Sequence, residues 1–188
     1  MGVVLVILYV LLGVLGIVAS LVLIAVIIAA LMPSGFRITR TAKMTALPAD
    51  IFPHVNDLRK WEAWSPWDKI DPNLKRTYEG PRDGTGAVYS WEGNKDVGAG
   101  RMTITESKPA ELILIRVEFF RPFAATNHAE FTFVPQGNQT VVSWSMTGNK
   151  AFIMKVFGLF MSMDKMIGGS FEQGLAQLKG IVEAPAKA

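Results

Sequence analysis

The sequence predicts an α+β protein in which one apolar helix precedes a curved, seven-stranded antiparallel sheet wrapped around a long C-terminal helix. Residues 3–32 include 27 apolar residues and no charge, whereas all 19 Lys and Arg and all 16 Asp and Glu follow Phe36. Over Leu74–Gly148 apolar side chains recur with a period of two, which is typical of strands. After Asn149 the period lengthens to three or four, which is typical of an amphipathic helix. The chain therefore divides into an apolar segment and one globular domain of ordinary size.

The apolar segment is long enough to cross a membrane. Thirty helical residues rise about 45 Å, more than the roughly 30 Å hydrocarbon core of a bilayer. A cleaved signal peptide has a basic start and an apolar run of about 7–15 residues, but no Lys or Arg precedes this segment and its run is about twice as long. A buried core helix rarely runs this far without a charge. We therefore predict an uncleaved single-pass transmembrane anchor over residues 1–35 and a globular domain over residues 36–188.

The charges that flank the anchor predict its orientation. Arg37, Arg40 and Lys43 follow the apolar segment closely, and the first acidic residue is Asp50. Basic residues next to a membrane span are enriched on the cytoplasmic side. The globular domain is therefore expected in the cytoplasm.

Composition and motifs argue against several classes of function. A net charge of +3 and a pI near 9.2 are too small an excess of bases to predict nucleic-acid binding. The absence of cysteine excludes disulfides, thiolate–metal sites and cysteine nucleophiles. The two histidines, His54 and His128, are far apart and have no H-x-H partner, so no metal site is predicted. Neither a G-x-S-x-G nucleophile pattern nor a phosphate-binding glycine loop with its lysine is present. We predict no catalytic residue and no cofactor.

Turn-forming residues divide the domain into short elements. Seven strands are expected, at Phe36–Met44, Leu74–Glu79, Ala87–Glu92, Arg101–Glu106, Glu111–Phe119, Ala125–Val134 and Thr140–Thr147. The short connections favour an antiparallel meander. A short helix bent at Pro53 and an aromatic segment at Asn56–Asp71 follow the first strand, and one helix is expected over Phe152–Val182, irregular at Gly168-Gly169. A sheet curved around one helix cannot close tightly along the whole helix, so we expect a cavity between them.

Four segments resemble a known family. They are NDLRKWEAWSPW (Asn56–Trp67), GAVYSWEGN (Gly86–Asn94), GAGRMTITES (Gly98–Ser107) and FGLFMSMDKMIGGSFEQGLAQLK (Phe157–Lys179). With the order of elements, they resemble the SRPBCC superfamily of helix-grip proteins, which includes START domains and the birch-pollen allergens, and within it the polyketide cyclase/dehydrase-like branch. The resemblance covers residues 36–183. It implies a hydrophobic cavity for lipids, polyketides, sterols or other apolar ligands, and it implies no particular reaction.

The period of two selects the side chains that face the helix. The residues expected to line the cavity are Trp64, Trp67, Tyr89, Trp91, Met102, Ile115, Val117, Phe119, Asn127, Phe131, Trp144, Val156, Phe160 and Met163. Large aromatic side chains also fill cores without a ligand, so core packing stays the alternative for most of them. Asn127 is polar on this face and could orient a ligand head group or bond to the backbone. His128 falls on the opposite face, which argues against a role as a general base.

Three tryptophans within seven residues allow more than one interpretation. Trp61 is expected in a small hydrophobic core that locks the short helices onto the sheet. For Trp64 and Trp67 the same role stands beside two others, a lid at the cavity mouth and contact with the membrane interface, where tryptophan is favoured.

Three functions fit these features. We favour a membrane-tethered module that binds a hydrophobic small molecule or lipid, because the anchor holds the cavity where such ligands concentrate. The first alternative is an enzyme of the cyclase/dehydrase kind, with Tyr89, Glu92 or Asn127 supplying polar contacts. The second is a protein-interaction or regulatory module whose cavity is closed. The expected partners are thus a hydrophobic ligand and the membrane, without nucleic acid, and the sequence predicts no particular oligomeric state.

Overall fold

The computed structural model describes residues 2–159 and 162–184, and the chain divides into two compact units. The helical unit comprises Met1–Ser34 and Lys150–Ser162, and the sheet unit comprises Gly35–Asn149 and Met163–Ala188. The chain therefore leaves the helical unit after Ser34, returns to it after the last strand, and then enters the sheet unit a second time.

The helical unit contains α1 (Gly2–Leu31) and α4 (Phe152–Gly158). α1 is an uncharged helix of 30 residues, and Ala29 is its one buried residue. It is long and apolar enough to cross a membrane. α4 packs against α1, and Lys155 Nζ donates a hydrogen bond of 2.7 Å to the carbonyl oxygen of Met32. A lysine at this place satisfies a carbonyl that follows the last helical turn of α1.

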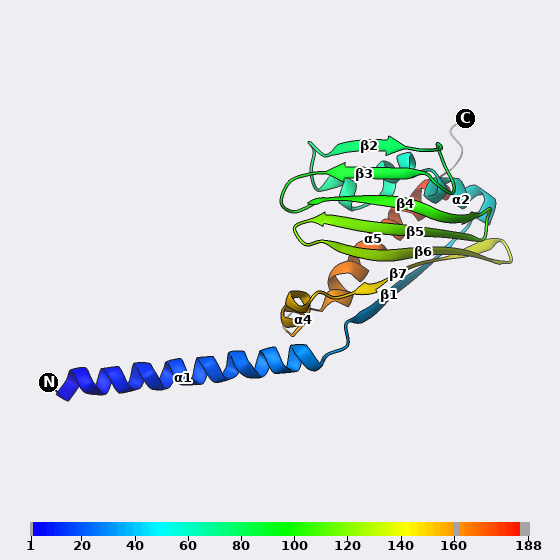
Figure 1. The fold of residues 1–188 in the computed structure, drawn as a ribbon. Helices are drawn as coiled ribbons and strands as arrows, with labels where there is room; N and C mark the ends of the chain where they lie inside the picture. Colours follow the sequence, from blue (N-terminus) through cyan, green and yellow to red (C-terminus); the bar gives the residue numbers. More distant parts are fainter. Residues whose placement is uncertain (1, 160–161, 185–188) are drawn as a thin grey trace. The chain divides into compact units, whose positions relative to one another are not determined.

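The sheet unit is built on one seven-stranded antiparallel sheet (Figure 1). Its strands are β1 (Gly35–Met44), β2 (Lys75–Glu79), β3 (Val88–Glu92), β4 (Ala99–Lys108), β5 (Leu112–Arg121), β6 (Ala125–Gln136) and β7 (Gln139–Asn149). Their spatial order is β1-β7-β6-β5-β4-β3-β2, so β2 to β7 form a meander and β1 joins the last strand. The structure confirms the predicted sheet, and each strand overlaps its expected range.

The curvature of the sheet has local causes in β4 and β5. The register between these strands shifts twice, because Phe120 of β5 is an extra residue opposite Ala99/Gly100 and Thr105 of β4 is an extra residue between Ile104 and Glu106. Each such bulge bends the strand that carries it and increases its twist. Gly100 also makes room for its neighbours, because a Cβ there would lie 2.4 Å from Cζ2 of Trp91 and 2.5 Å from the carbonyl oxygen of Glu118. The Trp91 ring therefore lies across a strand that carries no side chain at this position.

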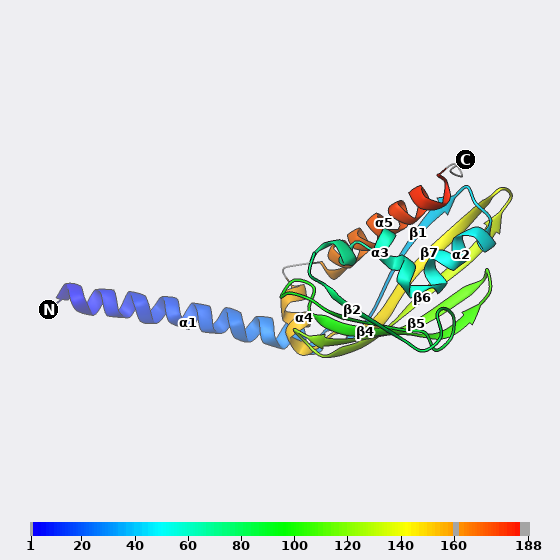
Figure 2. The same cartoon turned by 90° about the horizontal axis from the view of Figure 1, so that it is seen from above.

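Helices cover one face of the sheet, which we call the inner face (Figure 2). They are α2 (Pro48–Asn56), η1 (Leu58–Lys60), α3 (Trp61–Trp64), η2 (Trp67–Lys69) and α5 (Met163–Val182). α5 packs along β1 and against α3, and it buries Phe171, Leu175 and Leu178, which are spaced by four and three residues. The predicted α+β architecture, with a long C-terminal helix against a curved sheet, is confirmed.

The prediction of one continuous helix over Phe152–Val182 is wrong. Two helices, α4 and α5, occupy this stretch, and they belong to different units. The sequence period could not reveal the break because both pieces keep apolar residues at three- and four-residue steps. Gly158, which ends α4, is the local signal, since glycine is among the residues least favourable inside a helix.

The expected irregularity at Gly168-Gly169 is also wrong, because α5 continues through both residues. The Arg40 side chain crosses the helix at Gly168, where a Cβ would lie 2.1 Å from Nη2 of Arg40. The Arg40 guanidinium donates to Asp164 at 2.8 and 3.0 Å and to Glu172 at 2.6 Å. This hydrogen bond from Arg40 holds the pKa of the Asp164 carboxyl below its usual value. A single arginine thereby fastens two turns of α5 to β1.

An aromatic cluster fills the centre of the interface between the sheet and the helices. The Trp144 ring stacks on Phe171 of α5, with centroids 4.1 Å apart and planes at 8°, and on Phe131 at 4.8 Å. Trp61 and Trp64 of α3 meet the same ring edge-on, at 5.9 and 5.6 Å. Trp61, Trp64, Phe131, Trp144 and Phe171 are all buried. The expected core role of Trp61 is confirmed.

Candidate functional site

One row of residues crosses all seven strands on the inner face. The strand registers bring together, from β1 to β2, Phe36, Gly148, Asn127, Val117, Met102, Tyr89 and Tyr78. We call this set the transverse row. It lies close to the end of the sheet where β1 begins and β7 ends. Four of its members were predicted as lining residues, but the row itself depends on strand register, which side-chain alternation does not give.

Asn127 is the one amide in the transverse row, and its carbonyl oxygen has no partner. The residue is 8% exposed, and within the described residues nothing donates a hydrogen bond to Oδ1. Nδ2 points to the sulfur of Met146 at 3.8 Å, and a thioether is a weak acceptor. The amide lies over Gly148, where a Cβ would stand 2.0 Å from Oδ1. Leaving a buried acceptor unpaired costs about 1–3 kcal/mol.

A second unpaired polar atom faces the same interface. Nε1 of Trp144 is buried and lacks an acceptor among the described residues. Trp144 precedes Gly148, the register partner of Asn127, by four positions on β7, which is about 13 Å along a strand. The inner face thus offers an acceptor, Asn127 Oδ1, and a donor, Trp144 Nε1, in otherwise apolar surroundings. The sequence placed both residues on this face, but it could not show that they lack partners.

The other predicted lining residues differ in how much surface they retain. Trp64, Tyr89, Ile115, Val117 and Phe131 are buried. Trp67, Trp91, Met102 and Phe119 keep part of their surface exposed. Val156 is half-buried and belongs to α4 in the helical unit. Phe160 and the side chain of Met163 lie outside the described residues.

The hydroxyl of Tyr89 is already engaged within the protein. It donates to Oδ1 of Asp68 at 3.1 Å, and Arg76 Nε donates to the same oxygen at 2.9 Å. Burial, followed by the charge of Asp68, raises the pKa of the Tyr89 phenol, and the hydrogen bond to Asp68 raises the pKa of Arg76. Asp68 follows Trp67, so this group fixes η2 to β2 and β3. No sequence pattern pointed to it.

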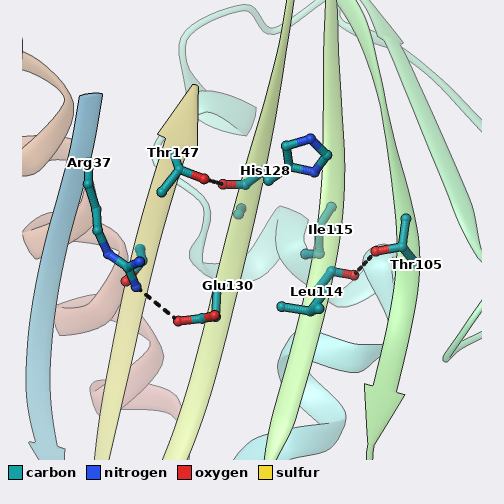
Figure 3. A pocket seen from close by; sticks show the side chains of 9 residues that line it. Arg37, Thr105, Leu114, Ile115, His128, Glu130 and Thr147 are labelled. Atoms are coloured by element: carbon teal, nitrogen blue, oxygen red, sulfur yellow. Dashed lines mark hydrogen bonds and ion pairs between the residues drawn. The ribbon is translucent and has the colours of Figure 1, made fainter. Parts of the chain in front are cut away.

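Two hollows are visible elsewhere on the sheet unit. One of about 240 Å³ lies on the outer face (Figure 3), where Arg37 and Glu130 form an ion pair of 3.3 Å. There Thr147 Oγ1 donates to the carbonyl of His128 at 3.4 Å, and the exposed His128 points outward as predicted. The other hollow, of about 300 Å³, lies beside Pro53 and Asp83. Within the described residues no three His, Asp or Glu side chains gather as metal ligands would.

The curved seven-stranded sheet with a long C-terminal helix across its inner face defines a helix-grip protein of the SRPBCC superfamily. The chain belongs to the family described as polyketide cyclase/dehydrase and lipid transport, whose model matches residues 35–183. Membership confirms the resemblance seen in the sequence and indicates a hydrophobic ligand. A search of curated proteins found no match to this chain.

Solved structures with the same fold come from distant relatives. A protein from Chromobacterium violaceum is 16% identical, with 82% of this chain and 100% of that chain aligned and a TM-score of 0.57. The Aha1 dimer from Colwellia psychrerythraea is 15% identical, with 81% and 99% aligned and a TM-score of 0.53. Ara h 8.0201 is 13% identical, with 79% and 97% aligned and a TM-score of 0.52. At these identities the comparison establishes the fold.

Proposed function

We propose that this protein is a membrane-tethered module that binds a lipid or another hydrophobic small molecule between the inner face of the sheet and the helices. The observation that carries the proposal is the buried, unpaired Oδ1 of Asn127. A polar group with no partner in an apolar interior destabilises the empty protein, so its presence favours a ligand that supplies the missing hydrogen bond. Family membership supports the same class of ligand.

The surroundings of Asn127 suit a ligand with one polar group on an apolar body. Val117 and Met102 continue the row on one side, and on the other side the amide itself lies over Gly148. In such surroundings a hydrogen bond to Oδ1 is stronger than in water. The ligand's polar group must donate to Oδ1, as a hydroxyl, a protonated carboxyl or an amine does.

Entry is easiest where the inner face is least tightly packed. The centre, around Trp144 and Phe171, is filled by stacked rings. Met102, Trp91 and Phe119 keep exposed surface on β3 to β5, whereas α5 packs along β1. A flexible thioether such as Met102 adapts to differently shaped apolar bodies. We place the ligand on this half of the inner face, with its polar group at Asn127.

The tether is short and joins the sheet at the end that carries the transverse row. Met32, Pro33 and Ser34 separate α1 from β1, which allows a reach of at most about 14 Å. Phe36, the second residue of β1, belongs to the row. A spanning α1 would thus keep the Asn127 end of the domain near the bilayer, where apolar ligands concentrate.

The sheet unit is proposed to lie in the cytoplasm. Arg37 and Lys43 follow α1 closely on β1, and basic residues next to a membrane span are enriched on the cytoplasmic side. Protease treatment of sealed inside-out vesicles should digest the sheet unit, and digestion only after detergent treatment would place it on the opposite side.

Native mass spectrometry of the full chain, released from detergent micelles, tests the binding proposal. We expect a defined mass adduct, which solvent extraction and lipid analysis then identify. A protein that carries no adduct, and that no lipid class protects against thermal unfolding, would contradict the proposal. Its five tryptophans all lie in the sheet unit, so their fluorescence follows unfolding of that unit alone.

A further inference from the structure

One end of the sheet gathers four places in the chain. β1 begins there at Gly35 and β7 ends there at Asn149, because these two residues are register partners. The connections from β3 to β4 and from β5 to β6 lie at the same end (Figure 1). The connection from β6 to β7, at Gly137 and Asn138, lies at the other end. We call the first of these the tether end, since β1 and β7 both connect to the helical unit there.

The β5–β6 connection exposes two aromatic side chains at the tether end. Phe120 is 53% exposed and Phe123 is 51% exposed, and between them stand Arg121 and Pro122. Among the described residues of the sheet unit, no other Phe, Tyr or Trp is so exposed. Two neighbouring phenylalanines that the fold leaves in water mark a surface that meets an apolar partner.

Both chain links at the tether end lead to further exposed apolar surface. α1 exposes nearly all of its apolar side chains. α4, which starts three residues after β7 ends, exposes Phe152, Ile153 and Phe157 by 41–53%. A bilayer is the partner that all of these surfaces share, since phenylalanine and isoleucine are favoured in its apolar region.

The distances permit the β5–β6 connection to reach the same bilayer. The tether spans at most about 14 Å, and three strand spacings from β1 to β5 add about 14 Å. The charge at the connection is balanced, because Arg121 Nη2 pairs with Glu92 Oε1 at 3.1 Å. Apolar insertion therefore needs no anionic lipid.

We propose that Phe120 and Phe123 insert into the interface of the bilayer that holds α1, so that the tether end of the sheet is docked on the lipid surface. This inference rests on the proposed tether. It adds a second contact with the membrane, which fixes the orientation of a domain that the tether alone would leave free to rotate. Docking presents the end of the transverse row, and with it Asn127, to the membrane, so that a lipid passes between bilayer and protein over a short path.

The absence of cysteine permits a direct test on the full chain. A nitrobenzoxadiazole fluorophore is attached to Ala124→Cys, beside Phe123, and in a second variant to Asn138→Cys at the opposite end of the sheet. Both proteins are reconstituted in phosphatidylcholine vesicles with and without doxyl-labelled acyl chains. We expect the doxyl lipids to quench the Ala124→Cys fluorophore at least twofold and to leave the Asn138→Cys fluorophore unchanged.

Replacing both Phe120 and Phe123 with serine in the Ala124→Cys protein should abolish the quenching. The exposed positions permit this change without loss of the fold, which tryptophan fluorescence checks. Equal quenching at both label sites, or quenching that survives the serine changes, would overturn the proposal. If the fluorophore at Ala124→Cys is shielded from aqueous iodide but is not quenched by doxyl lipids, a protein covers the β5–β6 connection. That result would also overturn the proposal.

Two further readouts separate this inference from the proposed function. If the protein stays in the vesicles after an alkaline carbonate wash and carries a lipid adduct, but its fluorophore is not quenched, the docking proposal is overturned. The proposal of a tethered binding module would then still stand. Release by carbonate would overturn the tether and the docking together, while the adduct would still report on ligand binding.

Discussion

Replacing Trp144 with alanine should lower the free energy of unfolding of the sheet unit by about 4 kcal/mol. Truncating a buried tryptophan costs about 3–5 kcal/mol through lost burial and the space left behind. We expect Trp144 to reach at least the middle of that range, because its ring stacks on both Phe131 and Phe171 and meets Trp61 and Trp64 edge-on. The rings around it come from β6 and from the helices α3 and α5, and no single neighbour can move to close the gap.

The measurement is denaturant unfolding of the full chain in detergent micelles, followed by circular dichroism in the strand region. Trp144→Phe is the matched control, since it keeps a ring in the stack and also removes the unpaired Nε1. We expect the control to lose less than about 1.5 kcal/mol. Equal losses for the two variants would show that the indole, rather than the stacked ring, stabilises the interface.

Replacing Asn127 with leucine should stabilise the protein and weaken ligand binding at the same time. Leucine has a similar shape and no polar atom to leave unpaired, so the free energy of unfolding should rise by about 1–2 kcal/mol. The same change removes the acceptor proposed for the ligand. Loss of one hydrogen bond worth about 1.4 kcal/mol weakens binding about tenfold.

Denaturant unfolding and the fraction of adduct in native mass spectra measure the two effects on one preparation. His128→Leu is the matched control, because it makes the same apolar change one residue along β6 on the outer face. We expect it to alter neither quantity by more than about 0.5 kcal/mol. A less stable Asn127→Leu protein would show that the amide is needed for the fold, and an unchanged adduct would show that the ligand does not use it.

Local patterns explain why the sheet was predictable. Alternation along strands such as Glu111–Phe119, and turn residues such as Gln136-Gly137-Asn138, are properties of neighbouring residues, and the structure has β5 and the β6–β7 turn at those places. The boundary between α4 and α5 was not predictable from the period, because Val156 and Ile167 fit one continuous stripe although they lie in different units.

The candidate site was predictable only in part, for a related reason. The alternation of side chains along the strand correctly predicts that Asn127 faces inward and His128 faces outward. Whether Oδ1 finds a partner depends on which residue of β7 lies opposite, and that residue is Gly148, which offers none. The partnership of Asp68 with Tyr89 likewise joins residues from separate elements, so it follows from tertiary packing and not from sequence spacing.

The pairing of β1 with β7 has a consequence for how the protein is made. Ile38 emerges from the ribosome about 100 residues before its register partner Met146, which is roughly 5–20 s at usual rates of synthesis. During that interval β1 is a strand without a neighbour. Arg37 and Lys43 protect it, since charged side chains on an open strand discourage other nascent chains from pairing with it. Folding of the sheet is completed only by the last strand to be synthesised.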